Sequence, residues 1–211
     1  MPTTKHHLTK GKDFLNGNSG SDLFLAPLVG GKPTLTGMDV LNGKAGFDRL
    51  VATFAGDSLA PRLKNIETAV LTRRDGQDCS LDLAHATALT NLVLKAFKDN
   101  LAISHASHLE TVSIIRAGAV DFVINGADLA KVHHLKLSLS HVANAEIDIL
   151  ASSVQQDYQT IELTLNHAAV TLGGSAMAET LVIHAKGKGL NYLYFNQTDA
   201  QTLVSKIVID G

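Results

Sequence analysis

The chain has 211 residues, of which 45% are hydrophobic, and its 18 basic and 20 acidic residues give a net charge of −2. This composition is typical of a folded domain with a sizeable core, and the well-mixed charges offer no basic surface for nucleic acid or an anionic membrane. No apolar run approaches the roughly 18 residues of a membrane span, no apolar signal segment is visible at the start, and the lone Cys79 excludes an intrachain disulfide.

The first predicted element is a pair of similar segments near the amino terminus. Two Gly-x-Asp triplets lie nine residues apart in "GKDFLNGNSGSDLF", residues 11–24, and again in "GMDVLNGKAGFDRL", residues 37–50. Nonapeptides of this kind wind a parallel β-roll, in which glycines permit left-handed turns and aspartate oxygens collect around Ca²⁺. The candidate metal ligands are Asp13, Asp22, Asp39 and Asp48, with Gly20 and Gly46 as turn glycines.

Two interpretations of these aspartates stay open. In a calcium-binding roll the same side recurs after about 18 residues, so Asp22 and Asp39, which are 17 residues apart, are expected to face one ion. Alternatively, the carboxylates cap backbone N–H groups in Asx-type turns that close the first coils. Lys44 and Arg49 stand within the pattern, and a nearby cation opposes a divalent ion.

A second repeat occupies the last three-quarters of the chain. It consists of an apolar residue, two polar residues, an apolar, a polar and an apolar residue. The copies lie at residues 89–94, 109–114, 132–137, 158–163, 178–183 and 204–209, with a degenerate first copy at 63–68. Their central apolar residues, at intervals of 20 to 26 residues, are Ile66, Leu92, Val112, Leu135, Ile161, Leu181 and Ile207.

A shorter strand pattern lies between consecutive copies and advances at the same pace. Its last apolar residues are Leu83, Ile103, Ile124, Ile149, Leu172 and Phe195. A unit of this length cannot bury its apolar side alone, so neighbouring units stack and each adds a rung of about 4.8 Å to parallel sheets. The sequence therefore predicts an all-β fold: a right-handed parallel β-helix, or β-solenoid, over residues 57–211, continuous with a capping β-roll over residues 1–56.

Two other folds also use regularly spaced leucines. A leucine-rich-repeat-like solenoid shares the L-x-x-L-x-L strand, but it requires an Asn ladder and a helix on the return leg, whereas the returns here are strand-like. A helical domain is disfavoured by the strict alternation of apolar and polar residues over 161–165.

The stretch from "LTGMDVLNGKAGFDRL" to "LDLAHATALTNLVL" resembles the repeats of bacterial RTX-type and S-layer proteins, most strongly over residues 8–94. The resemblance implies Ca²⁺-binding β-roll and β-helix repeats in a secreted protein of the cell surface. It also implies type I secretion without a cleaved amino-terminal signal, and a structural or adhesive role.

A polysaccharide-cleaving enzyme is the third functional hypothesis, after a structural protein and a ligand-binding module. Polysaccharide-cleaving β-helices need paired carboxylates, or a Ca²⁺–carboxylate cluster with a basic residue, on one outward face. The outward positions of the repeated strand show no acidic cluster, so we expect a noncatalytic protein. His85 and His105, in the same turn position of adjacent units, are a weaker candidate for a zinc site.

The last strand, "SKIVIDG", predicts the partner. No cap follows it, and unpaired strand edges are either covered or joined to another chain. Ile207 and Ile209 are the expected assembly edge, toward a second copy in an end-to-end array or dimer, or toward a cell-surface component. The alternative function is a glycan- or receptor-binding module of an adhesin or toxin.

Overall fold

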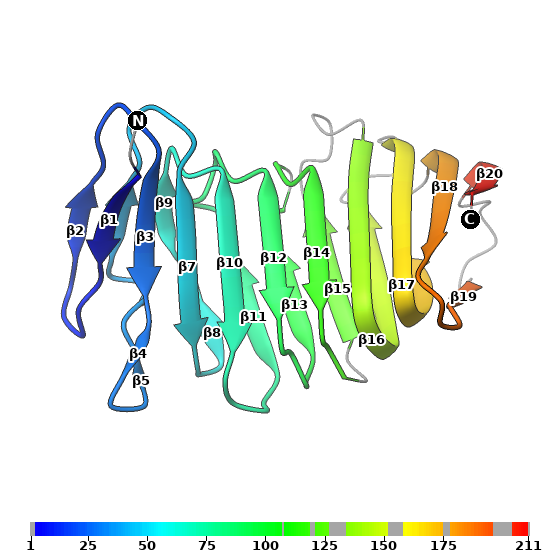
Figure 1. The fold of residues 1–211 in the computed structure, drawn as a ribbon, viewed down its shortest axis with the longest axis horizontal. Helices are drawn as coiled ribbons and strands as arrows, with labels where there is room; N and C mark the ends of the chain where they lie inside the picture. The colour runs from blue at the N-terminus through cyan, green and yellow to red at the C-terminus, as the bar shows by residue number, and fades with distance from the viewer. Residues whose placement is uncertain are drawn as a thin grey trace.

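The computed structural model describes residues 3–106, 108–118, 121–126, 134–151, 158–174, 178–195 and 204–210. All regular structure within these ranges is β-strand, and the strands stack in parallel as a β-solenoid of about seven turns (Figure 1). The predicted all-β solenoid is confirmed. The alternatives with helices are wrong, because the return legs in the described ranges are strands or turns.

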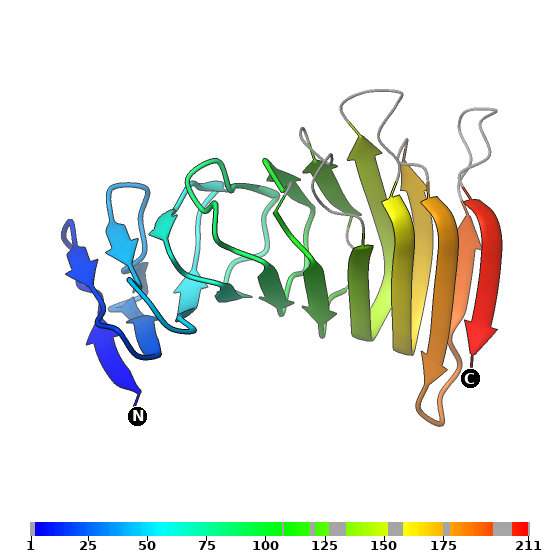
Figure 2. The same ribbon diagram turned by 90° about the horizontal axis from the view of Figure 1, so that it is seen from above.

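Three walls surround the interior, as the two perpendicular views show (Figures 1 and 2). The first wall contains β1 (Thr4–His7), β3 (Asp22–Ala26), β7 (Arg49–Phe54), β10 (Thr68–Arg73), β12 (Asn91–Lys95), β14 (Thr111–Ile115), the first parts of β16 (His134–Ala151) and β17 (Tyr158–Gly174), β18 (Ala178–Lys186) and β20 (Val204–Asp210). The second wall contains β8 (Ser58–Leu59), β11 (Cys79–Asp82), β13 (Leu101–Ser104), β15 (Asp121–Gly126), the second parts of β16 and β17, and β19 (Tyr192–Phe195).

The third wall has strands in the amino-terminal coils: β2 (Phe14–Asn16), β6 (Val40–Asn42) and β9 (Arg62–Lys64). The pair β4 (Leu28–Val29) and β5 (Lys32–Pro33) is an antiparallel hairpin that projects from this end. The first-wall sheet runs without a break across residue 56, because β7 pairs with β10 over six residues. The amino-terminal coils and the later coils therefore share one sheet.

Alternating side chains form the interior. In β12 the burial alternates residue by residue, with Leu92 and Leu94 fully inside. Successive coils place apolar residues directly above one another, so each interior position belongs to a column. One such column runs through Leu137, Leu163, Ile183 and Ile209.

The pairing register corrects part of the predicted columns. Leu92 pairs with Val112 as expected, but Val112 pairs with Leu137 and not with Leu135. Leu135 does pair with Ile161, as the sequence pattern predicts. A shift of two residues keeps every side chain on the same face of the strand, so the hydrophobic pattern cannot detect it.

The second wall and the first predicted copy show similar shifts. Ile103 pairs with Leu81 in place of Leu83, and Leu172 pairs with Ile147 in place of Ile149. The residue opposite Leu92 in the preceding coil is Ala69, and the expected Ile66 is instead buried in the turn before β10.

The corner between the first and second walls has a left-handed residue at the same position of successive coils. These residues are Ala96, Arg116, His141, His167 and Gly187, and the coil of His141 has a second one, Asn144. They follow the first-wall strands in register, and the rings of His141 and His167 stack with their centroids 5.3 Å apart. The column of left-handed residues turns the chain from one wall into the next.

Candidate functional site

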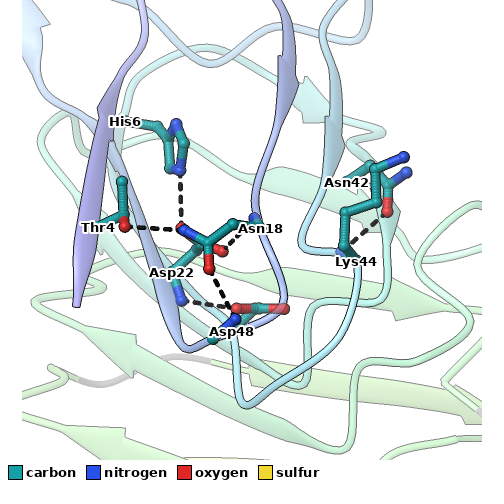
Figure 3. A network of polar contacts seen from close by, with 8 residues as sticks. Thr4, His6, Asn18, Asp22, Asn42, Lys44 and Asp48 are labelled. Atoms are coloured by element: carbon teal, nitrogen blue, oxygen red, sulfur yellow. Dashed lines mark hydrogen bonds and ion pairs between the residues drawn. The ribbon is translucent and has the colours of Figure 1, made fainter. Parts of the chain in front are cut away.

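The four predicted aspartates form two ladders at two different corners of the amino-terminal coils. Before β2, the backbone N–H of Asp13 donates to Oδ1 of Asp39 at 2.8 Å. Before β3, the backbone N–H of Asp22 donates to Oδ1 of Asp48 at 2.7 Å (Figure 3). Partners are 26 residues apart, which is one coil. The structure thus pairs Asp22 with Asp48, whereas the roughly 18-residue recurrence of a calcium-binding roll predicted that Asp22 and Asp39 face one ion.

In three of these aspartates, the Oδ2 oxygen accepts a hydrogen bond from the backbone of the same turn. Oδ2 accepts a backbone N–H from a residue three or four positions earlier, at 2.7 to 2.8 Å; the pairs are Thr9 with Asp13, Asn18 with Asp22, and Thr36 with Asp39. Each of these aspartates therefore satisfies one N–H within its coil and, where a ladder partner precedes it, one N–H of the coil before. This is the capping interpretation of the motif.

The ladder at the β3 corner extends in both directions. Glu67 accepts the backbone N–H of Asp48 through Oε2 at 2.7 Å. At the outer end, His6 Nε2 lies 2.9 Å from Oδ1 of Asp22 (Figure 3). The His6 ring also stacks on Phe24, with centroids 4.8 Å apart. His6 and Glu67 were missed by the sequence analysis, because neither stands in a Gly-x-Asp triplet.

Asp48 differs from the other three aspartates. Its Oδ2 is buried and has no hydrogen-bond partner among the described residues. The N–H of Lys44, which would correspond to that of Asn18, donates instead to Oδ1 of Asn42 at 3.1 Å (Figure 3). Lys44 has a left-handed φ of 77°. Burial raises the pKa of Asp48 above its ordinary value, against the opposing effect of the hydrogen bond from Asp22.

Glycines make room for the ladders. A Cβ at Gly43 would overlap the Asp48 carboxylate and the Asn65 carbonyl oxygen, and a Cβ at Gly46 would overlap the backbone of Gly20. Gly46 also has a φ of 129°, a region that favours glycine. The predicted turn glycines Gly20 and Gly46 therefore pack against each other in consecutive coils.

The described residues do not fit the shared calcium site that was expected for Asp22 and Asp39. Calcium takes six to eight oxygens, and no three or more His, Cys, Asp and Glu side chains in the described ranges are grouped so as to hold a metal. The oxygens of Asp13, Asp22 and Asp39 already accept backbone or side-chain donors. Calcium binding stays a prediction of the sequence pattern, and the capping bonds favour the alternative interpretation.

The predicted zinc pair is not part of a larger ligand set. No group of three or more His, Cys, Asp and Glu side chains in the described ranges includes His85 and His105. His105 Nδ1 instead contacts Oδ1 of Asp82 at 2.7 Å.

The predicted assembly edge lies on a coil whose apolar side chains are uncovered. Among the described strands, β20 pairs only with β18 and β19 only with β17. Ile207 and Ile209 are 52% and 74% exposed, whereas Leu181 and Ile183, one coil earlier in the same columns, are 0% and 7% exposed. The other exposed large apolar residues of this coil are Leu190, Tyr192, Tyr194 and Phe195.

A charged network crosses the outer face of the first wall beside this coil. Glu162 Oε2 lies 3.0 Å from Lys136 Nζ and 3.2 Å from His134 Nε2. His184 stands between Glu162 at 3.5 Å and Asp210 at 3.4 Å. The hydrogen bond from Lys136 lowers the pKa of Glu162. Lys136 and Glu162 are direct cross-strand neighbours, as are His184 and Asp210, whereas His134 and His184 reach Glu162 diagonally.

We compared the chain with protein-family models, with curated proteins and with solved structures. None of the three comparisons gave a match. In the part of the chain that the structure describes, there is no helix with the length and apolarity to cross a membrane. The likeness to RTX-type and S-layer repeats therefore rests on the residues and on a compatible β-solenoid.

Proposed function

We propose that this chain is a noncatalytic structural module that associates through its last coil. The observation that carries the proposal is the abrupt exposure of two interior columns, at Ile207 and Ile209. Bare strand edges with apolar side chains are energetically unfavourable in water and are normally covered by another chain. A second copy offers a matching edge.

The setting of this module is the exterior of a bacterial cell, as in the RTX-type and S-layer proteins that the repeats resemble. Stacked coils with short polar turns support this assignment, because they give a rigid rod with repeated outward faces. Type I secretion belongs to the same proposal. Its test is export of the whole chain when a type I exporter is supplied in a heterologous host.

Sedimentation velocity over a wide concentration range tests self-association. The chain is expected to form a larger species as concentration rises, and the double variant Ile207→Ser/Ile209→Ser is expected to remain monomeric. Phe47→Ser is the matched control, because Phe47 is as exposed as these isoleucines but lies on the amino-terminal coils. A wild-type chain that stays monomeric throughout contradicts the proposal, and turnover of a polysaccharide would point to an enzyme.

One observation favours the alternative, a glycan-binding module. Tyr192 and Tyr194 expose their rings on β19 and stack at 6.5 Å with an interplanar angle of 8°. Exposed aromatic rings of this kind offer flat apolar surface beside a polar hydroxyl. Binding of immobilised glycans that is lost in Tyr194→Ala, by a chain that remains monomeric, would support this function over assembly.

A further inference from the structure

The last strand carries a pattern that is complementary to itself. Residues 206–210 have the sequence Lys-Ile-Val-Ile-Asp, in which a basic residue and an acidic residue flank three apolar residues. The two charged ends are exposed, and the three central residues are β-branched. If a second copy of this strand runs in the opposite direction, each basic end meets an acidic end.

The register of such a pair follows from the positions of the charges. When the antiparallel pair is centred on Val208, Lys206 faces Asp210 of the second copy, Ile207 faces Ile209, and Val208 faces its own equivalent. Opposite charges and pairs of β-branched residues are favourable cross-strand neighbours. An antiparallel pair centred on any other residue of β20 would not place both Lys206 and Asp210 opposite a residue of opposite charge.

The faces of the strand also agree with this pairing. Ile207 pairs with Leu181 and Ile209 with Ile183, so both isoleucines continue interior columns. Lys206, Val208 and Asp210 therefore point outward. The apolar pairs would close the open interior, while the charged pairs would lie on the solvent side. Asp210 contacts His184 at 3.4 Å but is 75% exposed, which leaves it accessible to a second lysine.

The opposite end of the solenoid is a poor partner for this coil. The inward positions of β1 are Thr4 and His6, which pair with Asp22 and Phe24 of β3. His6 already contacts the Asp22 carboxylate. A head-to-tail stack would place Ile207 and Ile209 on these polar side chains and would leave the apolar columns poorly covered.

We propose that the chain forms a two-fold symmetric dimer, tail to tail, in which β20 pairs antiparallel with β20 of a second copy about Val208. This rests on the proposed self-association and specifies its geometry. An isologous contact of this kind closes on itself, so the assembly stops at two copies and does not grow into an array. The same axis brings the exposed aromatic side chains of β19 toward the contact.

Charge reversal tests the register. Lys206→Asp alone places two carboxylates opposite each other at both ends of the pair, and Asp210→Lys alone places two ammonium groups there. Each single variant is expected to dimerise roughly tenfold more weakly than wild type or worse, because unlike neighbours are replaced by like ones. An equimolar mixture of the two variants, and the double variant, are expected to regain dimerisation. Thermal unfolding of each variant controls for folding.

A disulfide tests the symmetry axis. Directly opposed residues of antiparallel strands have Cα atoms about 4.5 to 5.5 Å apart, within the range of about 4.4 to 6.8 Å that a disulfide spans. In a Cys79→Ala background, Val208→Cys is expected to form a covalent dimer under mild oxidation. Val182→Cys is the matched control, because Val182 occupies the same outward column one coil earlier.

The outcomes separate this inference from the proposed function. A wild-type chain that self-associates, with no cross-link at residue 208 and no recovery on mixing, overturns the antiparallel geometry and leaves self-association standing. A chain that is monomeric at every concentration overturns both. Large species that grow with concentration overturn the closed dimer in favour of an array.

Discussion

The two ends of the solenoid finish the same interior in opposite ways. At the amino-terminal end two columns stop at the polar side chains of Thr4 and His6, and His6 both stacks on Phe24 and contacts the Asp22 carboxylate. A third column ends at Leu8, which is buried. At the carboxy-terminal end the columns stop at Ile207 and Ile209, which remain exposed. The first end carries polar contacts within the chain, whereas the second leaves apolar side chains exposed, where we propose that a second copy binds.

This contrast shows that the aspartate ladders are part of how the first end is closed. Asp39 and Asp48 each accept an N–H of the coil before them, so backbone donors at two corners are satisfied by side chains. The last coil has no corresponding carboxylate ladder among the described residues. Among the described strands both β1 and β20 have an unpaired edge, but β20 also exposes the apolar side chains Ile207 and Ile209.

The largest expected effect comes from placing a charge in the column that connects the two ends. Leu163→Asp should lower the free energy of unfolding by about 4 kcal/mol or more, because Leu163 is fully buried and an unpaired carboxylate would lie in the interior. The same substitution at Ile209, in the same column, should leave the stability of the monomer almost unchanged. Chemical denaturation at low protein concentration measures both.

The same two substitutions are expected to differ in their effect on self-association as well as on stability. Ile209→Asp is expected to abolish the concentration dependence of sedimentation while its unfolding remains close to wild type. Equal destabilisation by the two substitutions would mean that Ile209 is covered within the monomer, and would remove the difference between the ends.

A smaller effect is expected where the ladders require glycine. Gly43→Ala should cost about 1 to 3 kcal/mol, since the new methyl group would overlap the Asp48 carboxylate and the Asn65 carbonyl oxygen. Gly11→Ala is the control, because a Cβ there would make only an ordinary contact with Thr9. Thermal unfolding compares them. If both substitutions are equally mild, the carboxylate ladder does not restrict the turn.

The pH dependence should have opposite signs at the two ends. Burial raises the pKa of Asp48 above 3.8, so its favourable contribution is present in acid and is lost as pH rises through the raised pKa. Lys136 lowers the pKa of Glu162 below 4.5, so the contribution of Glu162 is present above pH 4.5 and is lost as pH falls through the lowered pKa.

Two isosteric variants measure this difference. Relative to wild type, Asp48→Asn should gain stability as pH rises from 3 to 7, with 3.8 as the ordinary pKa of the group it replaces. Glu162→Gln should lose stability over the same rise, by less than about 1 kcal/mol because the pair is partly exposed. Parallel pH profiles for the two variants would contradict the assigned causes.

The periodicity of the sequence was sufficient to predict the solenoid and the exposed last strand, but not the register. Val112 was matched to Leu135 where the structure pairs it with Leu137. Both choices keep the apolar face inward, and the difference depends on the length of the turn between coils. Hydrophobic alternation contains no information on that length.

The ladders were predictable in residue identity but not in pairing. The nine-residue spacing is real, yet it separates two corners of one coil and does not relate one coil to the next. The relevant spacing was visible in the same segments, since Asp13 to Asp39 and Asp22 to Asp48 are both 26 residues. The contact of His6 with Asp22 left no local signal, because it depends on how β1 pairs with β3.

The smallest expected effect is that of calcium. Since Asp13, Asp22 and Asp39 are occupied by capping bonds, the melting temperature should be the same in chelator and in excess Ca²⁺. Asp48 is the residue to vary, because its Oδ2 is the one ladder oxygen without a hydrogen-bond partner in the described part of the chain. Asp48→Asn should respond to Ca²⁺ no differently from wild type. A stabilisation of about 2.7 kcal/mol at a hundred times the dissociation constant, lost in Asp48→Asn, would instead show that the amino-terminal end is closed by an ion as well as by hydrogen bonds.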